Sequence, residues 1–242
     1  MGNISDPAEH IRKPFLPAIR AAVESARLAS SAADEDVSKV LARASILHCC
    51  FVVEALANNL LLFVNWGSDL SKSLEKLDPI SKIELFARFL PEPKMVNRGD
   101  KSIQVLNDFI RLRNSYAHPK ILKRGLREKR PGVFEAVSKD FKFISLEFDP
   151  ERWSYQEAKA SIKALVVSVD QLLLDVLRLD KKFMSCAFLD VISIGGARGP
   201  VFDDVQPWIT WLVSDLNCPP KFYVDHIVVG MLESLGSTKG VR

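Results

Sequence analysis

The residues best suited to chemistry in this chain are concentrated in one segment, Arg111-Leu-Arg-Asn-Ser-Tyr-Ala-His-Pro119. Arg113 and Asn114 follow Phe109 and Ile110 at three- and four-residue spacing, so a helix would place both polar side chains beside an apolar stripe. Burying an arginine without a partner costs several kcal/mol. We therefore expect Arg113 to meet a carboxylate, a phosphate ligand or a second subunit.

The same segment ends with His118, followed by Pro119, which should terminate the helix. The negative end of the helix dipole lies there and suits a proton donor or a contact to phosphate. A single histidine at a helix end is also typical of a simple cap, and the residue types leave both interpretations open.

Glu54 is the acidic residue in the chain best placed to meet this segment. In a helical reading it shares one face with Leu47, Cys50, Phe51, Asn58 and Leu61, which puts a carboxylate and an amide on an otherwise apolar surface. One interpretation is a structural ion pair of Glu54 with Arg113 or Arg111. The other is a polar cavity in which Glu54 orients an arginine or a histidine that contacts a phosphate.

Positive charge is concentrated around this motif. The span from Arg111 to Arg130 carries +7, whereas the whole chain carries +3, so the remainder is acidic. Such a run is often a solvated loop, but phosphate-bearing partners are the main class of ligands that clustered positive charges bind. The basic residues are Arg111, Arg113, Lys120, Lys123, Arg124, Arg127, Lys129 and Arg130.

The elements that must position these residues read as helices. Pro14, Pro17 and Gly67 act as start and stop signals, and Asp78-Pro79 and the Ser154/Glu157 capping box mark further helix starts. The pattern predicts helices from Pro17 to Ser31, Val37 to Trp66, Asp78 to Leu90, Gly99 to Pro119 and Ser154 to about Lys182, and two shorter ones near 205–215 and 221–234. Phe141 to Phe148 alternates imperfectly and predicts a short strand or half of a hairpin, and residues 194–200 read as a loop.

The overall prediction is an all-α bundle with one short β-hairpin insertion. Residues 1–184 would form the bundle, with its core at about 37–182, and residues 185–242 a helical C-terminal appendix. Trp208, Trp211 and their apolar neighbours would either cover the bundle core or dock a partner.

Composition excludes several classes. The 48% hydrophobic and 26% charged residues are typical of globular domains rather than disordered or fibrous chains. The apolar stretch from Ile46 to Trp66 contains His48, Glu54 and three asparagines, so we expect a buried helix and no membrane span. The four cysteines form no C-x-x-C pair and follow no secretory leader, which predicts reduced thiols, a cytoplasmic location and no metal site.

Taken together, Arg113-Asn114 followed after three residues by His118 resembles the R-N-x-x-x-H form of the R-x(4–6)-H signature of HEPN domains. The context is similar too: a long preceding helix carries an acidic residue, in Phe51-Val-Val-Glu-Ala-Leu-Ala-Asn58, and Leu77-Asp-Pro-Ile-Ser-Lys-Ile-Glu-Leu85 follows. The resemblance covers roughly Val37 to Lys182.

This resemblance implies an endoribonuclease that needs no metal or other cofactor, a hydrolase acting as a toxin or phage-defence effector. Two protomers would pair so that two motifs face one cleft. His118 would be the general acid/base, Arg113 would stabilise charge on the phosphate and Asn114 would orient them. Glu54 and Asn58 would support the site, and Tyr116 would stack on a base or pack in the dimer interface.

The partners implied are RNA, a second copy of the chain, and an antitoxin or regulatory protein. The basic residues from Arg111 to Arg130 would bind the RNA. Two alternatives remain open: a non-catalytic nucleotide- or RNA-binding module, and a protein-interaction module in which Arg113 and Glu54 form only a buried pair.

Overall fold

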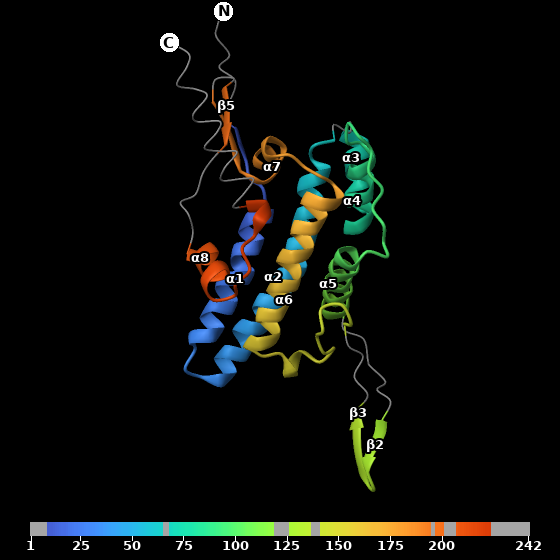
Figure 1. Ribbon diagram of the computed structural model, residues 1–242, viewed down its shortest axis with the longest axis vertical. Coiled ribbons are helices and arrows are strands. Elements are labelled where there is room, and N and C mark those ends of the chain that lie inside the picture. Colours follow the sequence, from blue (N-terminus) through green and yellow to red (C-terminus); the bar gives the residue numbers. More distant parts are fainter. Residues whose placement is uncertain are drawn as a thin grey trace, which may run out of the picture.

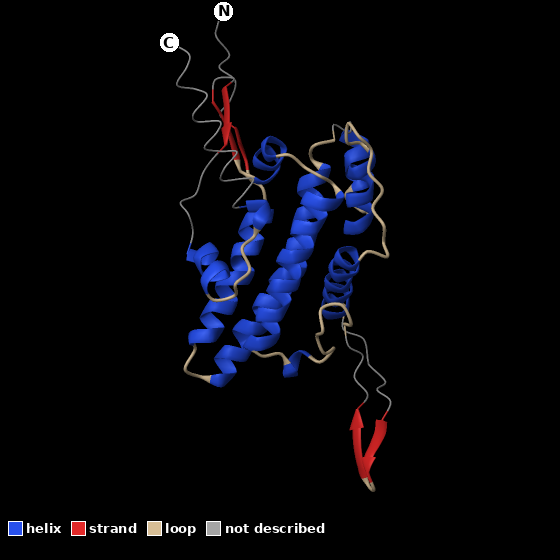
Figure 2. Ribbon diagram, in the orientation of Figure 1, coloured by secondary structure: helices blue, strands red, loops and turns tan. Residues whose placement is uncertain are grey.

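The computed structural model describes residues 9–64, 68–118, 126–136, 141–194, 197–200 and 207–223, and within them the chain is mostly helical, as predicted. Short strands occupy two places outside the helical bundle (Figure 2). The helices are α1 (Phe15–Ser31), α2 (Glu35–Leu61), α3 (Ser68–Leu74), α4 (Pro79–Arg88), α5 (Lys101–Ala117), α6 (Tyr155–Asp170), α7 (Lys181–Phe188) and α8 (Pro207–Ser214). The strands are β1 (Glu9–Ile11), β2 (Leu126–Arg130), β3 (Val133–Ala136), β4 (Val191–Ile194) and β5 (Ala197–Pro200).

Helix α2 is the central element of the bundle. It packs against α1, α4, α5 and α6, and the long axes of α1, α2, α5 and α6 lie roughly side by side in Figure 1. Ile46 and Leu56 of α2 are fully buried against residues such as Ile19 of α1, Phe109 of α5 and Leu165 of α6. The face that α2 turns to its neighbours is therefore a continuous apolar core.

Side-chain caps confirm the predicted starts of α4 and α6, and a third cap places the start of α2 two residues before the predicted Val37. The Asp34 carboxylate accepts the backbone N–H groups of Asp36 and Val37 at the start of α2. Asp78 accepts the N–H of Ser81 with Pro79 at the first position of α4. Ser154 and Glu157 form the reciprocal capping box of α6. Each side chain satisfies a backbone donor that the first helical turn leaves without a partner.

The long helix α2 ends at Leu61, five residues before the end that the sequence pattern predicts at Trp66. By length and composition it could cross a bilayer, but 56% of its most apolar window is buried in the bundle. Burial of this kind is typical of a core helix.

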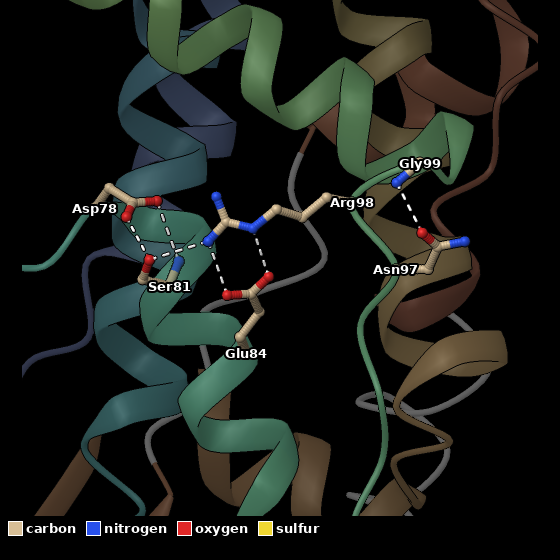
Figure 3. A network of polar contacts seen from close by, with 6 residues as sticks. All are labelled: Asp78, Ser81, Glu84, Asn97, Arg98 and Gly99. Atoms are coloured by element: carbon tan, nitrogen blue, oxygen red, sulfur yellow. Dashed lines mark hydrogen bonds and ion pairs between the residues drawn. The ribbon is translucent and has the colours of Figure 1, made fainter.

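The connection from α4 to α5 is braced by a polar network (Figure 3). The Arg98 guanidinium donates to both carboxylate oxygens of Glu84, at 2.6 and 2.8 Å, and to the Ser81 hydroxyl at 3.2 Å. Ser81 in turn binds Asp78, the cap of α4. The loop that precedes α5 is thereby tied to the body of α4, and this fixes where α5 begins.

The strands are where the sequence prediction is wrong. Phe141 to Phe148 forms only a single bridge, between Phe141 and Leu146. The hairpin lies earlier, as β2–β3, in the basic segment that reads as a loop. Its turn is made by Pro131-Gly132, with Gly132 at φ +77° and its N–H donated to Glu128 Oε1 at 2.8 Å. Glycine takes this positive φ without steric cost.

A second strand pair was also missed, at residues 191–194 and 197–200, around the segment that was predicted as a loop. Strands β4 and β5 pair there, and β1 joins them antiparallel with His10 opposite Ile192. The pairing of β1 with β4 joins residues about 180 positions apart. A local pattern contains no information about so distant a partner, so the sequence did not show that β1 belongs to this sheet.

The predicted helix from Ser154 to about Lys182 is interrupted. α6 ends at Asp170, the π-helix η2 (Gln171–Val176) follows, and Arg178 adopts φ +54° before α7 begins under an Asp180 cap. The wide turn keeps Leu172 and Leu173 buried, so the apolar periodicity continues across it and conceals the break.

The C-terminal segment packs on α1. Trp208, Ile209, Trp211 and Leu212 of α8 are buried, so this patch covers the core. The Phe222 ring lies 5.5 Å from that of Phe15. One buried cluster thus extends across the predicted boundary at residues 184 and 185. Residue 205 and most of the predicted helix at 221–234 lie outside the described residues.

Candidate functional site

Arg113 and Glu54 form an ion pair that joins α5 to α2. Arg113 Nη1 donates to Glu54 Oε2, and the two side chains are 28% and 36% exposed. Arg113 also donates from Nε and Nη2 to Asn114 Oδ1, at 3.1 and 2.9 Å. The guanidinium is therefore held between a carboxylate and an amide oxygen at the edge of the bundle, where part of it remains open to solvent.

Arg111, the other arginine considered for Glu54, binds a different acid. Its Nη1 lies 3.1 Å from Asp108 Oδ1, and Asp108 Oδ2 accepts the Phe143 N–H at 2.8 Å. Asp108 is buried on the apolar face of α5, whereas the Arg111 side chain is mostly exposed. Sequence analysis missed Asp108; the signal was an acid inside the apolar run from Val105 to Leu112.

His118 is the C-cap of α5. Its φ of −124° and ψ of 69° leave the helix, and its backbone N–H donates to the Asn114 carbonyl at 3.1 Å. The side chain is exposed, as is that of Tyr116, which is 48% exposed. The last turn of α5 therefore presents an imidazole and a phenol to solvent, one turn beyond the anchored Arg113.

Cys50 lies beneath this cation on α2. Burial raises the pKa of the Cys50 thiol to about 12, and the nearby Arg113 charge only partly opposes the effect. At neutral pH the group is a neutral thiol, so Arg113 keeps Glu54 as its anionic partner here.

Asn58, predicted as a supporting residue, binds a lysine that sequence analysis did not select. Lys82 Nζ donates to Asn58 Oδ1 at 2.7 Å, although Lys82 is only 2% exposed. Burial lowers the pKa of Lys82, against the opposing charges of Glu75 and Asp78. The available signal was its position between Ile80 and Ile83, inside the apolar face of α4.

The structure brings Glu54, Arg113 and Asn114 into contact, with Tyr116 and His118 on the following turn. The remaining predicted RNA-binding residues are only partly described. Lys120, Lys123 and Arg124 lie outside the described residues, Arg127 is in β2, and Lys129 and Arg130 are exposed near the tip of the β2–β3 hairpin.

Metal-binding groups do not gather in the part of the chain that the structure describes: no three His, Cys, Asp or Glu side chains there could hold one ion. The comparisons with known proteins give no relative: no family model matches the chain, and neither a curated protein nor a solved structure shows a significant match.

Proposed function

We propose that this chain is a HEPN-type endoribonuclease that needs no metal, and that it cleaves RNA through attack of a ribose 2′-hydroxyl on the adjacent phosphate. The observation that carries the proposal is the last part of α5. Arg113 is held in place by Glu54 and Asn114, and five residues later, about 7.5 Å along a helix axis, His118 is exposed. A fixed cation and an accessible imidazole are the two groups that such a reaction requires.

In the proposed reaction the His118 imidazole removes the proton of the 2′-hydroxyl. The new O2′–P bond forms as the P–O5′ bond breaks. The resulting His118 imidazolium then returns the proton to the leaving O5′. Arg113 binds the phosphate oxygens, on which negative charge increases in the transition state. The products are a 2′,3′-cyclic phosphate and a 5′-hydroxyl, and DNA is no substrate because it lacks the attacking group.

The outward face of α2 supports the proposed homodimer. Apolar side chains follow this face at alternating three- and four-residue steps from Val37 to Phe51, and Val40 and Phe51 are each about half-exposed or more. This spacing is the one that lets two helices pair along a seam. The stripe consists of Val37, Val40, Ala44, Leu47 and Phe51, and exposed Leu62 continues it just beyond the end of α2.

Glu54 and Asn58 interrupt that stripe, so pairing of two α2 helices along it would bring the two Glu54–Arg113 pairs toward the dimer axis. A site composed from both protomers follows from this arrangement. We assign the protein to the cytoplasm as a toxin or defence effector, with an antitoxin or regulatory protein controlling it.

The test is incubation of RNA with wild-type protein and with His118→Ala in excess chelator, with analysis of product ends. Cleavage by wild type alone, leaving 2′,3′-cyclic phosphates, is the expected result. Because the exposed His118 side chain makes no packing contribution to the core, both proteins should melt at nearly the same temperature. Equal cleavage by both would refute the assignment of His118.

One observation favours a second candidate, a non-catalytic RNA-binding module. Three nitrogens of Arg113 already have partners within the protomer. If Glu54 and Asn114 keep the guanidinium when RNA is present, the wild type binds RNA in a salt-dependent manner and releases no products.

A further inference from the structure

We propose that the β2–β3 hairpin is an RNA-docking arm that holds phosphates remote from the scissile bond, so that the protein selects long RNA over short RNA. This inference rests on the proposed function and adds its substrate preference. Figure 1 shows the hairpin beyond the C-terminal end of α5, well apart from the helical bundle.

The first argument is that the arm packs little on the other elements that the structure describes. β2 and β3 pair with each other, and neither packs extensively on another described element. A two-stranded hairpin on its own is at best marginally stable in water. A partner that covers the hairpin would supply the missing stabilisation.

The second argument is chemical. Lys129 and Arg130 are exposed next to the Pro131-Gly132 turn, whereas Glu128 folds back and accepts the Gly132 N–H. Lys120, Lys123 and Arg124 precede the arm in the sequence. Lysine is depleted in protein–protein interfaces, but it is a common contact to nucleic-acid phosphates. Charge complementarity therefore favours RNA over a protein partner.

The third argument is placement. β2 begins eight residues after His118 in the sequence, and its five residues alone span about 16 Å at 3.3 Å each. That length corresponds to roughly five nucleotide steps of about 3.4 Å in a stacked strand.

The returning chain is also fixed to the motif helix. The Phe143 N–H binds the buried Asp108 carboxylate of α5, and Asp108 in addition holds Arg111. The base of the arm is therefore anchored one to two turns before the candidate site, and its tip lies away from it.

The experiment compares the affinity of the intact protein for 2′-O-methyl RNA, which cannot be cleaved, at two lengths of about six and about twenty nucleotides. The variant Lys129→Glu/Arg130→Glu reverses the charge of the arm. The matched control Lys72→Glu/Lys76→Glu makes the same charge change on exposed residues of α3 and the turn after it, at the other end of the bundle.

We expect the arm variant to bind the long RNA at least about tenfold more weakly and the short RNA within about twofold of wild type. Loss of two phosphate contacts should also reduce the slope of log K against log salt by about 1.4. The control should match wild type at both lengths.

Unchanged affinity for the long RNA in the arm variant would overturn the inference, as would a change from dimer to monomer in light scattering with RNA binding retained. The proposed function is judged separately, on unmodified RNA. If the wild type binds long RNA through the arm but does not cleave it, the proposed nuclease function is refuted and the proposed role of the arm stands. Cleavage with equal binding by the arm variant refutes the arm alone, and a wild type that binds no RNA refutes both.

Discussion

The Glu54 carboxylate on α2 and the Arg113 guanidinium on α5 form an ion pair that joins two residues 59 positions apart in the sequence. The pair lies at the edge of the core, about one-third exposed, and Asn114 completes it from the next position on α5. The same contact therefore links the central helix to the motif and fixes the direction of the guanidinium.

The pair should contribute more to activity than to stability. Partly exposed ion pairs contribute about 1 kcal/mol or less, so Glu54→Gln should lower the free energy of unfolding by about that amount. Because Arg113 then loses its orienting carboxylate, RNA cleavage well below the melting temperature should fall at least about tenfold. A double-mutant cycle with Arg113→Gln, read by urea unfolding, measures the coupling. Unimpaired cleavage by Glu54→Gln would show that the pair is only structural.

The exposed stripe on α2 predicts a charge-sensitive dimer. Val40→Glu places two carboxylates in the proposed seam, and their desolvation and mutual repulsion should convert the dimer to a monomer without unfolding the bundle, because Val40 is exposed in the protomer. Val213→Glu is the matched control, since Val213 on α8 is similarly exposed. Light scattering should detect dissociation in the first variant only; a Val40→Glu protein that remains dimeric would place the interface elsewhere.

Lys82 should make stability dependent on alkaline pH. Burial lowers its pKa in the folded protein below the ordinary value of 10.5, so the unfolded chain binds its proton more tightly. Burial of the charged ammonium group costs stability. This cost is fully present below the pKa of Lys82 in the folded protein and disappears as the pH rises toward 10.5. Compared with Lys82→Met, the wild type should therefore gain stability between neutral pH and that value.

The measurement is urea unfolding of both proteins across this range, taken as the difference between them. Subtraction is needed because burial raises the thiol pKa of Cys49 and Cys50, which acts in the opposite direction. Parallel curves for the two proteins would mean that Lys82 titrates as an ordinary lysine.

The four cysteines should react in a clear order. Cys186 is exposed, whereas Cys49, Cys50 and Cys218 are buried and burial raises the thiol pKa of each. Since only the accessible thiolate reacts, iodoacetamide at neutral pH should modify Cys186 first and the other three only after denaturation. Mass spectrometry of native protein gives the order, and early labelling of Cys50 would contradict its burial near Arg113.

Helices whose signals are local were predictable. Asp78-Pro79 and the Ser154/Glu157 box act within one turn, so the residue types alone place the start of each helix. The Glu54–Arg113 contact could also be predicted, because a charged residue on each of two apolar faces requires a partner. The sequence did not decide which arginine Glu54 would bind. Asp108 lies three residues before Arg111 on α5 and was a local partner for it, but only the packing of α5 on α2 shows that Arg113 meets Glu54.

Elements stabilised by distant partners were not predictable. β1 pairs with β4 from some 180 residues away, and the apolar periodicity continues unbroken through η2. Lys82 was missed because a lysine on an amphipathic helix is usually solvated, and only the packing of α4 on α2 shows that its ammonium group is buried against Asn58.

The pairing of β1 with β4 has a kinetic consequence. α1 and α2 are consecutive and pack extensively, so they can associate while the chain is still short, at little cost in loop-closure entropy. β1 can join β4 only after the helices between them have been synthesised, because some 180 residues separate the two strands. Residues 9–11 are therefore synthesised before these helices but reach their final place after them, and among the described segments they should be the last to gain protection from amide hydrogen exchange during refolding.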